Sequence, residues 1–175
     1  MAGYKINAII NFADPENFRE IIVPQGINLH QLHEIIQIVF GFKNYHDYEF
    51  VFENNSTSYQ NMEDDLTENI RNSNNVIIDD IFDNPGIIYL YDFDDEWVIS
   101  VLFEEKIEDY SKNFPILGKC QGKYNPPEDV GGVAEFIHLI EMEESPVDYS
   151  NNEDYVKLEL FNKDKTSKIL ESMKF

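Results

Sequence analysis

Residues 4–41 read YKINAIINFADPENFREIIVPQGINLHQLHEIIQIVFG, and they hold two strand patterns followed by a helix pattern. Apolar and polar residues alternate over residues 4–12 and again over residues 18–23, which is typical of strands with one buried face. The Asp-Pro-Glu-Asn sequence at residues 14–17 is a turn signal between them. This order predicts a β-hairpin that leads into a helix.

The helix is predicted through residue 40 by its two ends and by its apolar spacing. Asn28 is a suitable N-cap residue, and Gly41 follows the last apolar position, where glycine commonly ends a helix. Between these two residues, one helical face collects the apolar side chains Leu29, Leu32, Ile36, Val39 and Phe40. A stripe of this kind is expected to pack against a sheet.

The remaining sequence contains further strand and helix patterns. Strands are predicted at residues 48–53, 86–91 and 97–104, and helices at residues 133–143 and 165–173. Residues 54–75, rich in Asn, Ser, Asp and Glu, are predicted to form an acidic loop excursion. Together these elements predict one α+β domain over residues 1–175, with an antiparallel or mixed sheet and helices packed on one face.

The charge of the chain is strongly negative and unevenly distributed. Thirty-four acidic residues stand against 13 lysines and arginines, which gives a formal net charge of −21. Residues 63–109 alone hold fifteen acidic residues against Arg71 and Lys106. This balance argues against direct nucleic-acid binding, because neutralising phosphates requires lysine and arginine. It favours attraction to a basic protein partner.

An acidic partner-binding surface is therefore expected around and after residues 92–96. The residues assigned to it are Asp92, Asp94, Asp95, Glu96, Glu104, Glu105, Glu108 and Asp109. Tyrosine and tryptophan side chains among them would anchor the interface, while the carboxylates would set the association rate. The competing interpretation is that these acids only solvate the outer face of the sheet.

Several protein classes are excluded by composition. Apolar residues make up 42% of the chain and aromatic residues 14%, so it is not a disordered acidic tail. It has no run of eighteen apolar residues and no apolar leader, which predicts a soluble protein without membrane contact. A single cysteine, Cys120, argues against a disulfide framework.

Residues 119–132, KCQGKYNPPEDVGG, are the most unusual segment of the chain. Two prolines fix the φ angle, and two glycines permit backbone angles that other residues resist. The segment ends just before the helix predicted at residues 133–143. We therefore expect a shaped loop that holds Glu128 and Asp129 in defined positions, and functional sites commonly lie on such loops.

Landmarks along most of the chain occur in the order of a known family. They are residues 32–37 (LHEIIQ), residues 40–42 (FGF), His46, Phe50, residues 91–93 (YDF), Asp95, Trp97, Cys120, Gly122 and residues 126–132 (PPEDVGG). Over roughly residues 4–170 the chain resembles the plasmid pRi ORF-three-like family, which comprises small α+β proteins common on plasmids, phages and other mobile elements. The Pro-Pro-Glu-Asp-Val-Gly-Gly element is the most specific part of the match.

The chain departs from the family pattern at two positions. Asp94 stands where the family usually has glycine, and Ile99 stands where it usually has histidine. A role of that histidine is therefore not carried over to this chain. The resemblance implies no established enzyme activity. Recombinase chemistry is also disfavoured, because the chain has only Arg19 and Arg71 to manage phosphate charge.

Several of the landmarks have side chains that bind metals. Zinc takes Cys sulfur, His nitrogen and carboxylate oxygen, usually with four ligands in a structural site. A structural zinc ion is therefore predicted from the set His33, His46, Asp95, Cys120 and Glu128, with Asp92 and Asp129 nearby. No C-x-x-C or H-E-x-x-H spacing supports it. The alternatives are that His33 is a hydrogen-bonded core residue, Cys120 an inert buried thiol and the acids turn formers.

The leading functional hypothesis is a non-enzymatic binding protein of the bacterial host cytoplasm that acts on a basic partner. Its most concrete form, from the charge and the mobile-element resemblance, is an anti-CRISPR protein of a phage or other mobile element. Such a protein would inhibit a type II RNA-guided nuclease by blocking target-DNA loading, since the nuclease channel is positively charged. The alternatives are a metal-dependent hydrolase that uses Cys120, His33 or His46 and Glu128, and a mobile-element protein with unrelated contacts.

Overall fold

A single mixed sheet organises the structure, a computed structural model that describes residues 1–52, 57–61, 69–153 and 155–175. The strands in these residues are β1 (Gly3–Ile10), β2 (Phe18–Pro24), β3 (Tyr48–Val51), β4 (Ser58–Gln60), β5 (Ile70–Asn72), β6 (Gly86–Tyr91), β7 (Trp97–Ile107) and β8 (Ile116–Gln121). They lie in the order β5-β4-β3-β6-β7-β1-β2-β8. The β4–β5 pair is parallel and the other pairs are antiparallel.

The helices are α1 (Leu29–Phe40), α2 (Gly132–Glu144) and α3 (Lys163–Ser172), with short 3₁₀ turns at Ser73–Asn75 and Ile78–Asp80. Helix α1 begins with a capping box: Asn28 Oδ1 accepts from Gln31 N at 2.8 Å, and Asn28 N donates to Gln31 Oε1 at 2.9 Å. It ends at Gly41, whose φ of 80° is left-handed. No described helix has the length and apolar content needed to cross a membrane.

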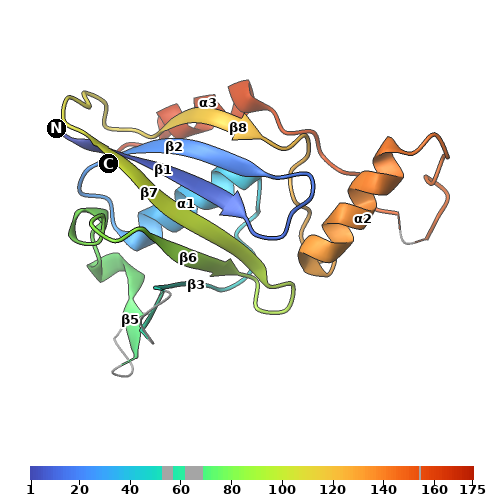
Figure 1. Ribbon diagram of the computed structural model, residues 1–175, viewed down its shortest axis with the longest axis horizontal. Helices are drawn as coiled ribbons and strands as arrows, with labels where there is room; N and C mark the ends of the chain where they lie inside the picture. Colours follow the sequence, from blue (N-terminus) through green and yellow to red (C-terminus); the bar gives the residue numbers. More distant parts are fainter. Residues whose placement is uncertain (53–56, 62–68, 154) are drawn as a thin grey trace.

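One face of the sheet is covered and the other is not. Figure 1 shows α1 and α3 behind the sheet and α2 beyond its end, beside the β6–β7 turn, so α2 does not cover the face. The apolar stripe of α1 is fully buried, and it packs with the buried side chains of β1, β2, β6 and β7 in one core. Side chains that point to the opposite face of these strands are half-buried or exposed. We call this the outer face.

The α+β class, the β1–β2 hairpin and the mixed sheet are confirmed. Strand β8 was not predicted, and its last residues, 119–121, fall in the expected shaped loop. It pairs with β2 at the sheet edge, with Arg19 opposite Cys120. Residues 54–75 contain β4, β5 and a 3₁₀ turn. The rest of that predicted excursion, residues 54–56 and 62–68, lies outside the described residues.

Candidate functional site

Three loops meet at one end of the sheet, beside the start of α2 (Figure 1). They are residues 41–47 after α1, the β6–β7 turn at residues 92–96, and residues 125–131 before α2. Direct hydrogen bonds join each loop to the others, from Lys43 N to Glu128, from Val130 N to Asp95 and from Asp92 N to the Asp47 carbonyl oxygen. Several family landmarks that are far apart in the sequence, among them His46, Asp95 and residues 126–131, therefore gather here, and this is the candidate site.

Asp95 holds the third loop in place. Its Oδ2 accepts a hydrogen bond from Val130 N and its Oδ1 accepts one from Gly131 N, each at 3.0 Å. Gly132 lies against the same turn, since a Cβ at this position would stand 2.1 Å from the carbonyl oxygen of Asp95. The glycine and the aspartate together allow the start of α2 to approach the β6–β7 turn.

Glu128 links the third loop to the first. Its Oε1 accepts from Lys43 N at 2.6 Å and from the Tyr91 hydroxyl at 2.8 Å. The Tyr91 oxygen in turn accepts from Tyr45 N at 3.0 Å. Burial and the Glu128 carboxylate raise the pKa of Tyr91, so the phenol stays a donor to the carboxylate. Glu128 thus holds the first and third loops together.

His46 lies between two carboxylates of the other loops. Its Nε2 is 3.0 Å from Asp129 Oδ1 and 3.4 Å from Asp92 Oδ2. Asp92 is 2% exposed, and its Oδ1 accepts from Asp94 N at 3.1 Å and Asp95 N at 3.3 Å. The ligand atoms of His46, Asp92 and Asp129 all lie within 4.8 Å of one another. Of the described residues, these form the one set of three or more His, Cys, Asp or Glu side chains spaced to hold a metal ion.

His33 lies apart from this set, within the core. Its Nδ1 is 2.7 Å from the Tyr89 hydroxyl and its Nε2 is 2.9 Å from Asn44 Oδ1, and its ring stacks on Tyr48 at 3.7 Å. The amide oxygen of Asn44 can only accept, so Nε2 carries the proton and Nδ1 accepts from Tyr89. Burial lowers the pKa of His33 to about 4. His33 is therefore a neutral, hydrogen-bonded residue.

Cys120 is also remote from the candidate site. It lies on β8, and four strands separate β8 from β3, the strand that follows His46. Its paired residue on the neighbouring strand β2 is Arg19. The thiol is half-buried, and burial raises its pKa, although the Arg19 charge opposes this shift. Among the five residues of the predicted zinc set, the structure brings Asp95, Glu128 and His46 into the candidate site. Both Asp95 oxygens accept backbone hydrogen bonds, and Glu128 Oε1 accepts from Lys43 N and the Tyr91 hydroxyl.

The acids assigned to partner binding separate into groups. Asp92 is buried and Asp95 is half-buried against the loop. Asp94 and Glu96 are exposed in the turn before β7, and Glu104, Glu105, Glu108 and Asp109 are exposed along and after its far end. At about 3.3 Å per residue, the two exposed groups stand about 30 Å apart along β7. No described lysine from residues 157–174 forms an ion pair with them.

Asp92 and Asp129 lie closer to His46 than the sequence predicted. Asp92 is expected from the sequence on the partner-binding surface, and both residues are expected only near the zinc set. Tyr91 is buried on β6, so strand alternation would turn Asp92 outward, but its φ of 58° ends the strand and turns the side chain inward. Asp129 also has a left-handed φ of 57°. Aspartate tolerates this conformation better than most residues, and the sequence does not show which of two adjacent acids adopts it.

Similar proteins include one relative by sequence and one solved structure. An uncharacterized protein of Sinorhizobium fredii, y4hQ, is 28% identical over 131 residues, which is 73% of this chain and 66% of that protein. A crystal structure of a protein of unknown function from Methanosarcina mazei Go1 superposes with a TM-score of 0.72 at 26% identity, covering 82% of this chain and 83% of that one.

Residues 2–167 match the family described as plasmid pRiA4b ORF-3-like protein. This match includes all three loops of the candidate site and every strand and helix described above except the last turns of α3. The chain therefore belongs to the plasmid pRiA4b ORF-3-like protein family.

Proposed function

We propose that this chain is a non-enzymatic binding protein that attaches to a basic surface of a partner protein through the outer face of its sheet. The supporting observation is an aliphatic patch at the centre of that face, bordered by carboxylates. The patch, called the outer patch below, consists of Ile9, Ile88, Leu90, Val98 and Leu102.

The register makes the outer patch continuous across three strands. Leu90 pairs with Val98, and Ser100 lies between Ile88 on one side and Ile9 on the other. No described helix lies over this face of the sheet (Figure 1). Leu102 is 38% exposed, and the other four side chains of the outer patch are half-buried. The solvent-facing side of an antiparallel sheet is commonly polar, so a bare aliphatic centre is a mark of an interaction surface.

The border of the outer patch is acidic. Glu49 lies opposite Leu90, and Glu20 lies on the same face across β1. At the far end of β7, Glu104 accepts from Asn7 at 3.0 Å and Glu105 pairs with Lys5 at 2.8 Å. An apolar centre with a charged rim is the usual anatomy of a protein interface.

Charge decides which kind of partner this surface fits. A second copy of the chain would bring another net charge of −21 and another acidic rim against the first. Like charges facing one another across an interface cost several kcal/mol, so self-association through this face is disfavoured. A basic partner surface with apolar side chains at its centre complements both the patch and its rim.

A type II RNA-guided nuclease is the most concrete partner, and inhibition by blocking target-DNA loading is the proposed action. Such nucleases hold the guide–target duplex in a positively charged channel. The negative charge of this chain supports the proposal, as does its membership of a family described after a plasmid reading frame. This function requires no catalytic residue in the chain.

The proposal is tested by binding and cleavage assays with a purified type II nuclease loaded with guide RNA. The Leu90→Ser and Leu102→Ser double variant removes part of the outer patch without changing charge. We expect it to weaken binding at least tenfold and to relieve inhibition of DNA cleavage. The matched control is Val147→Ser and Ile169→Ser, at exposed positions outside the outer patch. Equal binding by the two variants contradicts the proposed surface.

A metal-dependent hydrolase is the second candidate function, favoured by the convergence of His46, Asp92 and Asp129. It predicts metal-stimulated turnover on a panel of esters and phosphate esters. His46→Ala should remove that turnover, while His138→Ala, at an exposed histidine of α2, should not. Absence of turnover with zinc or manganese across the panel counts against this candidate.

A further inference from the structure

We propose that His46, Asp92 and Asp129 form a binding site for a divalent metal ion that suits mixed nitrogen and oxygen ligands, such as zinc. The site differs from the ligand set expected from the sequence, since it uses neither Cys120 nor His33. It is independent of partner binding through the outer face, whereas the hydrolase candidate requires it.

The spacing of the three ligand atoms supports the site. Bonds of about 2.0–2.2 Å to a tetrahedral zinc ion place its ligand atoms about 3.4 Å apart. Here His46 Nε2 is 3.4 Å from Asp92 Oδ2 and 3.0 Å from Asp129 Oδ1, and the remaining pair is within 4.8 Å. A small movement of Asp129, whose side chain is 69% exposed, is enough to complete the geometry.

An unsatisfied polar atom, His46 Nε2, provides a second observation. His46 Nε2 is shielded from solvent and makes no directed hydrogen bond, although both carboxylates are near it. The Asp92 side chain is only 4% exposed, and its Oδ2 lies 3.4 Å from this nitrogen. Buried polar atoms are normally paired. A cation between the ring nitrogen and the two carboxylates would satisfy all three groups.

The surrounding contacts fix the ligands as they do in metal proteins. Asp92 Oδ1 is held by the N–H groups of Asp94 and Asp95, which leaves Oδ2 for an ion. The Tyr91 hydroxyl lies 3.4 Å from His46 N and donates to Glu128. Asp95 anchors the loop that carries Asp129. Such outer contacts orient ligands and raise metal affinity.

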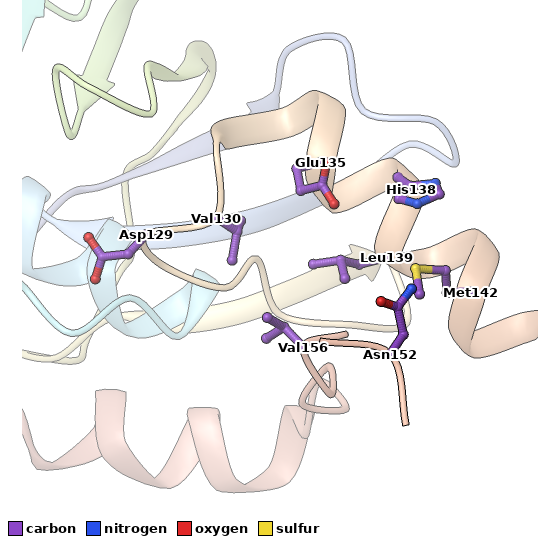
Figure 2. Close-up of a pocket in the computed structure, with 8 residues that line it drawn as sticks. All are labelled: Asp129, Val130, Glu135, His138, Leu139, Met142, Asn152 and Val156. Carbon is purple, nitrogen blue, oxygen red and sulfur yellow. The ribbon is translucent and has the colours of Figure 1, made fainter. Parts of the chain in front are cut away.

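Asp129 is directed toward this site and away from a neighbouring cavity. A cavity of about 490 Å³ lies beside α2. Figure 2 shows that the Asp129 carboxylate points away from other side chains that line this cavity, such as Leu139 and Val156. The position of Asp129 is therefore consistent with a contact to His46 and not with a role in that cavity.

Three protein ligands leave at least one metal position open. His46 also lines a different cavity of about 400 Å³, together with His30, His33, Tyr48 and Phe93. Three protein ligands with an open position are the pattern of zinc sites that accept water or another small ligand, and closed structural sites have four. An ion in this site is thus expected to take water or another small ligand at its open position.

A different arrangement of the same atoms is a protonated His46 that bridges the two carboxylates as an ion pair. In that arrangement added metal would compete with a proton and bind weakly. Calorimetry distinguishes a metal site from an ion pair of His46 with the carboxylates. The chain is purified without a nickel column, treated with a chelator and titrated with zinc chloride and, separately, with manganese chloride at pH 7.5. We expect one equivalent of zinc bound with a Kd of micromolar order or tighter.

Substitutions of the proposed ligands test where the metal ion binds. Asp129→Asn removes one charge at an exposed position and keeps the left-handed φ, which asparagine tolerates. This variant and His46→Ala should each weaken zinc binding at least tenfold, while His138→Ala, an exposed histidine beside Glu141, should bind as the parent does. Circular dichroism of each variant establishes that it is folded.

X-ray absorption at the zinc edge gives an independent readout. The proposed ligands predict nitrogen and oxygen scatterers at about 2.0–2.2 Å, while a Cys120 ligand would add sulfur at about 2.3 Å. The inference is overturned by less than a tenth of an equivalent of bound zinc, by a sulfur shell, or by unchanged affinity in both His46→Ala and Asp129→Asn.

Discussion

Asp95 illustrates how an acidic side chain that the sequence suggests as a surface charge can be structural. Its two oxygens accept from consecutive backbone N–H groups, at Val130 and Gly131. The neighbouring Asp94 is exposed and its carboxylate is not used in this way. The same local composition therefore serves two purposes, and only the contacts of the folded chain distinguish them.

Asp95→Ala is expected to destabilise the protein by about 2 kcal/mol, because hydrogen bonds to charged acceptors contribute more than neutral ones. Asp94→Ala is the matched control and should change the free energy of unfolding by less than about 0.5 kcal/mol. Urea denaturation of both variants measures the difference. Equal stabilities of the two variants would show that the Asp95 contacts contribute nothing to the fold.

His33 predicts a pH dependence of stability. Its pKa is lowered by burial from 6.5 to about 4, so between these values the unfolded chain binds more protons than the folded one. Stability contributed by neutral His33 is therefore complete above about pH 6.5 and is lost as the pH falls toward 4, by about 3 kcal/mol. His33→Gln should flatten this slope relative to the parent chain in denaturation experiments between pH 4 and 7. Parallel slopes would contradict it.

At the scale of elements, local signals predicted α1 and the hairpins well. The capping box at Asn28, the left-handed Gly41 and the buried stripe between them are as expected from sequence. Strand β8 was missed because Gly118 and Lys119 interrupt its apolar pattern, and it is held by pairing with β2 and by contact with α3. Local sequence patterns do not predict such an edge strand, since its stability comes from contacts with residues that are distant in the sequence.

Helix α2 depends on a close backbone approach that the Gly-Gly pair permits. Gly132→Ala would place a Cβ 2.1 Å from the Asp95 carbonyl oxygen, in addition to strain at a φ of 75°. Gly26 has a similar φ of 84° but open space around its Cβ position, so Gly26→Ala measures the strain alone. We expect Gly132→Ala to cost at least about 2 kcal/mol more in urea denaturation. Equal costs would mean that the loop can move away.

At the scale of the whole molecule, the sequence predicted the family and the α+β class. It did not predict which side chains would meet. Asp92 and Asp129 reach His46 because each has a left-handed backbone conformation, and His33 is removed from the set by its contacts with Tyr89 and Asn44. These outcomes depend on long-range geometry, which composition and spacing do not encode.

The distribution of charge is a further property of the whole molecule. The exposed carboxylates lie at both ends of β7 and around the outer patch, so a partner that covers this face would meet negative charge along its full length. Electrostatic attraction of this kind increases the association rate and is screened by salt, while burial of the aliphatic centre is not.

The measurement that tests the central claim most directly is the affinity of the chain for a guide-loaded type II nuclease as a function of ionic strength. We predict that the association rate falls at least tenfold between 50 and 500 mM salt, as expected when the Debye length shortens from about 14 to about 4 Å. The double variant Leu90→Ser and Leu102→Ser should instead dissociate faster at every salt concentration. No binding at 50 mM salt, or an affinity indifferent to salt, would contradict the account.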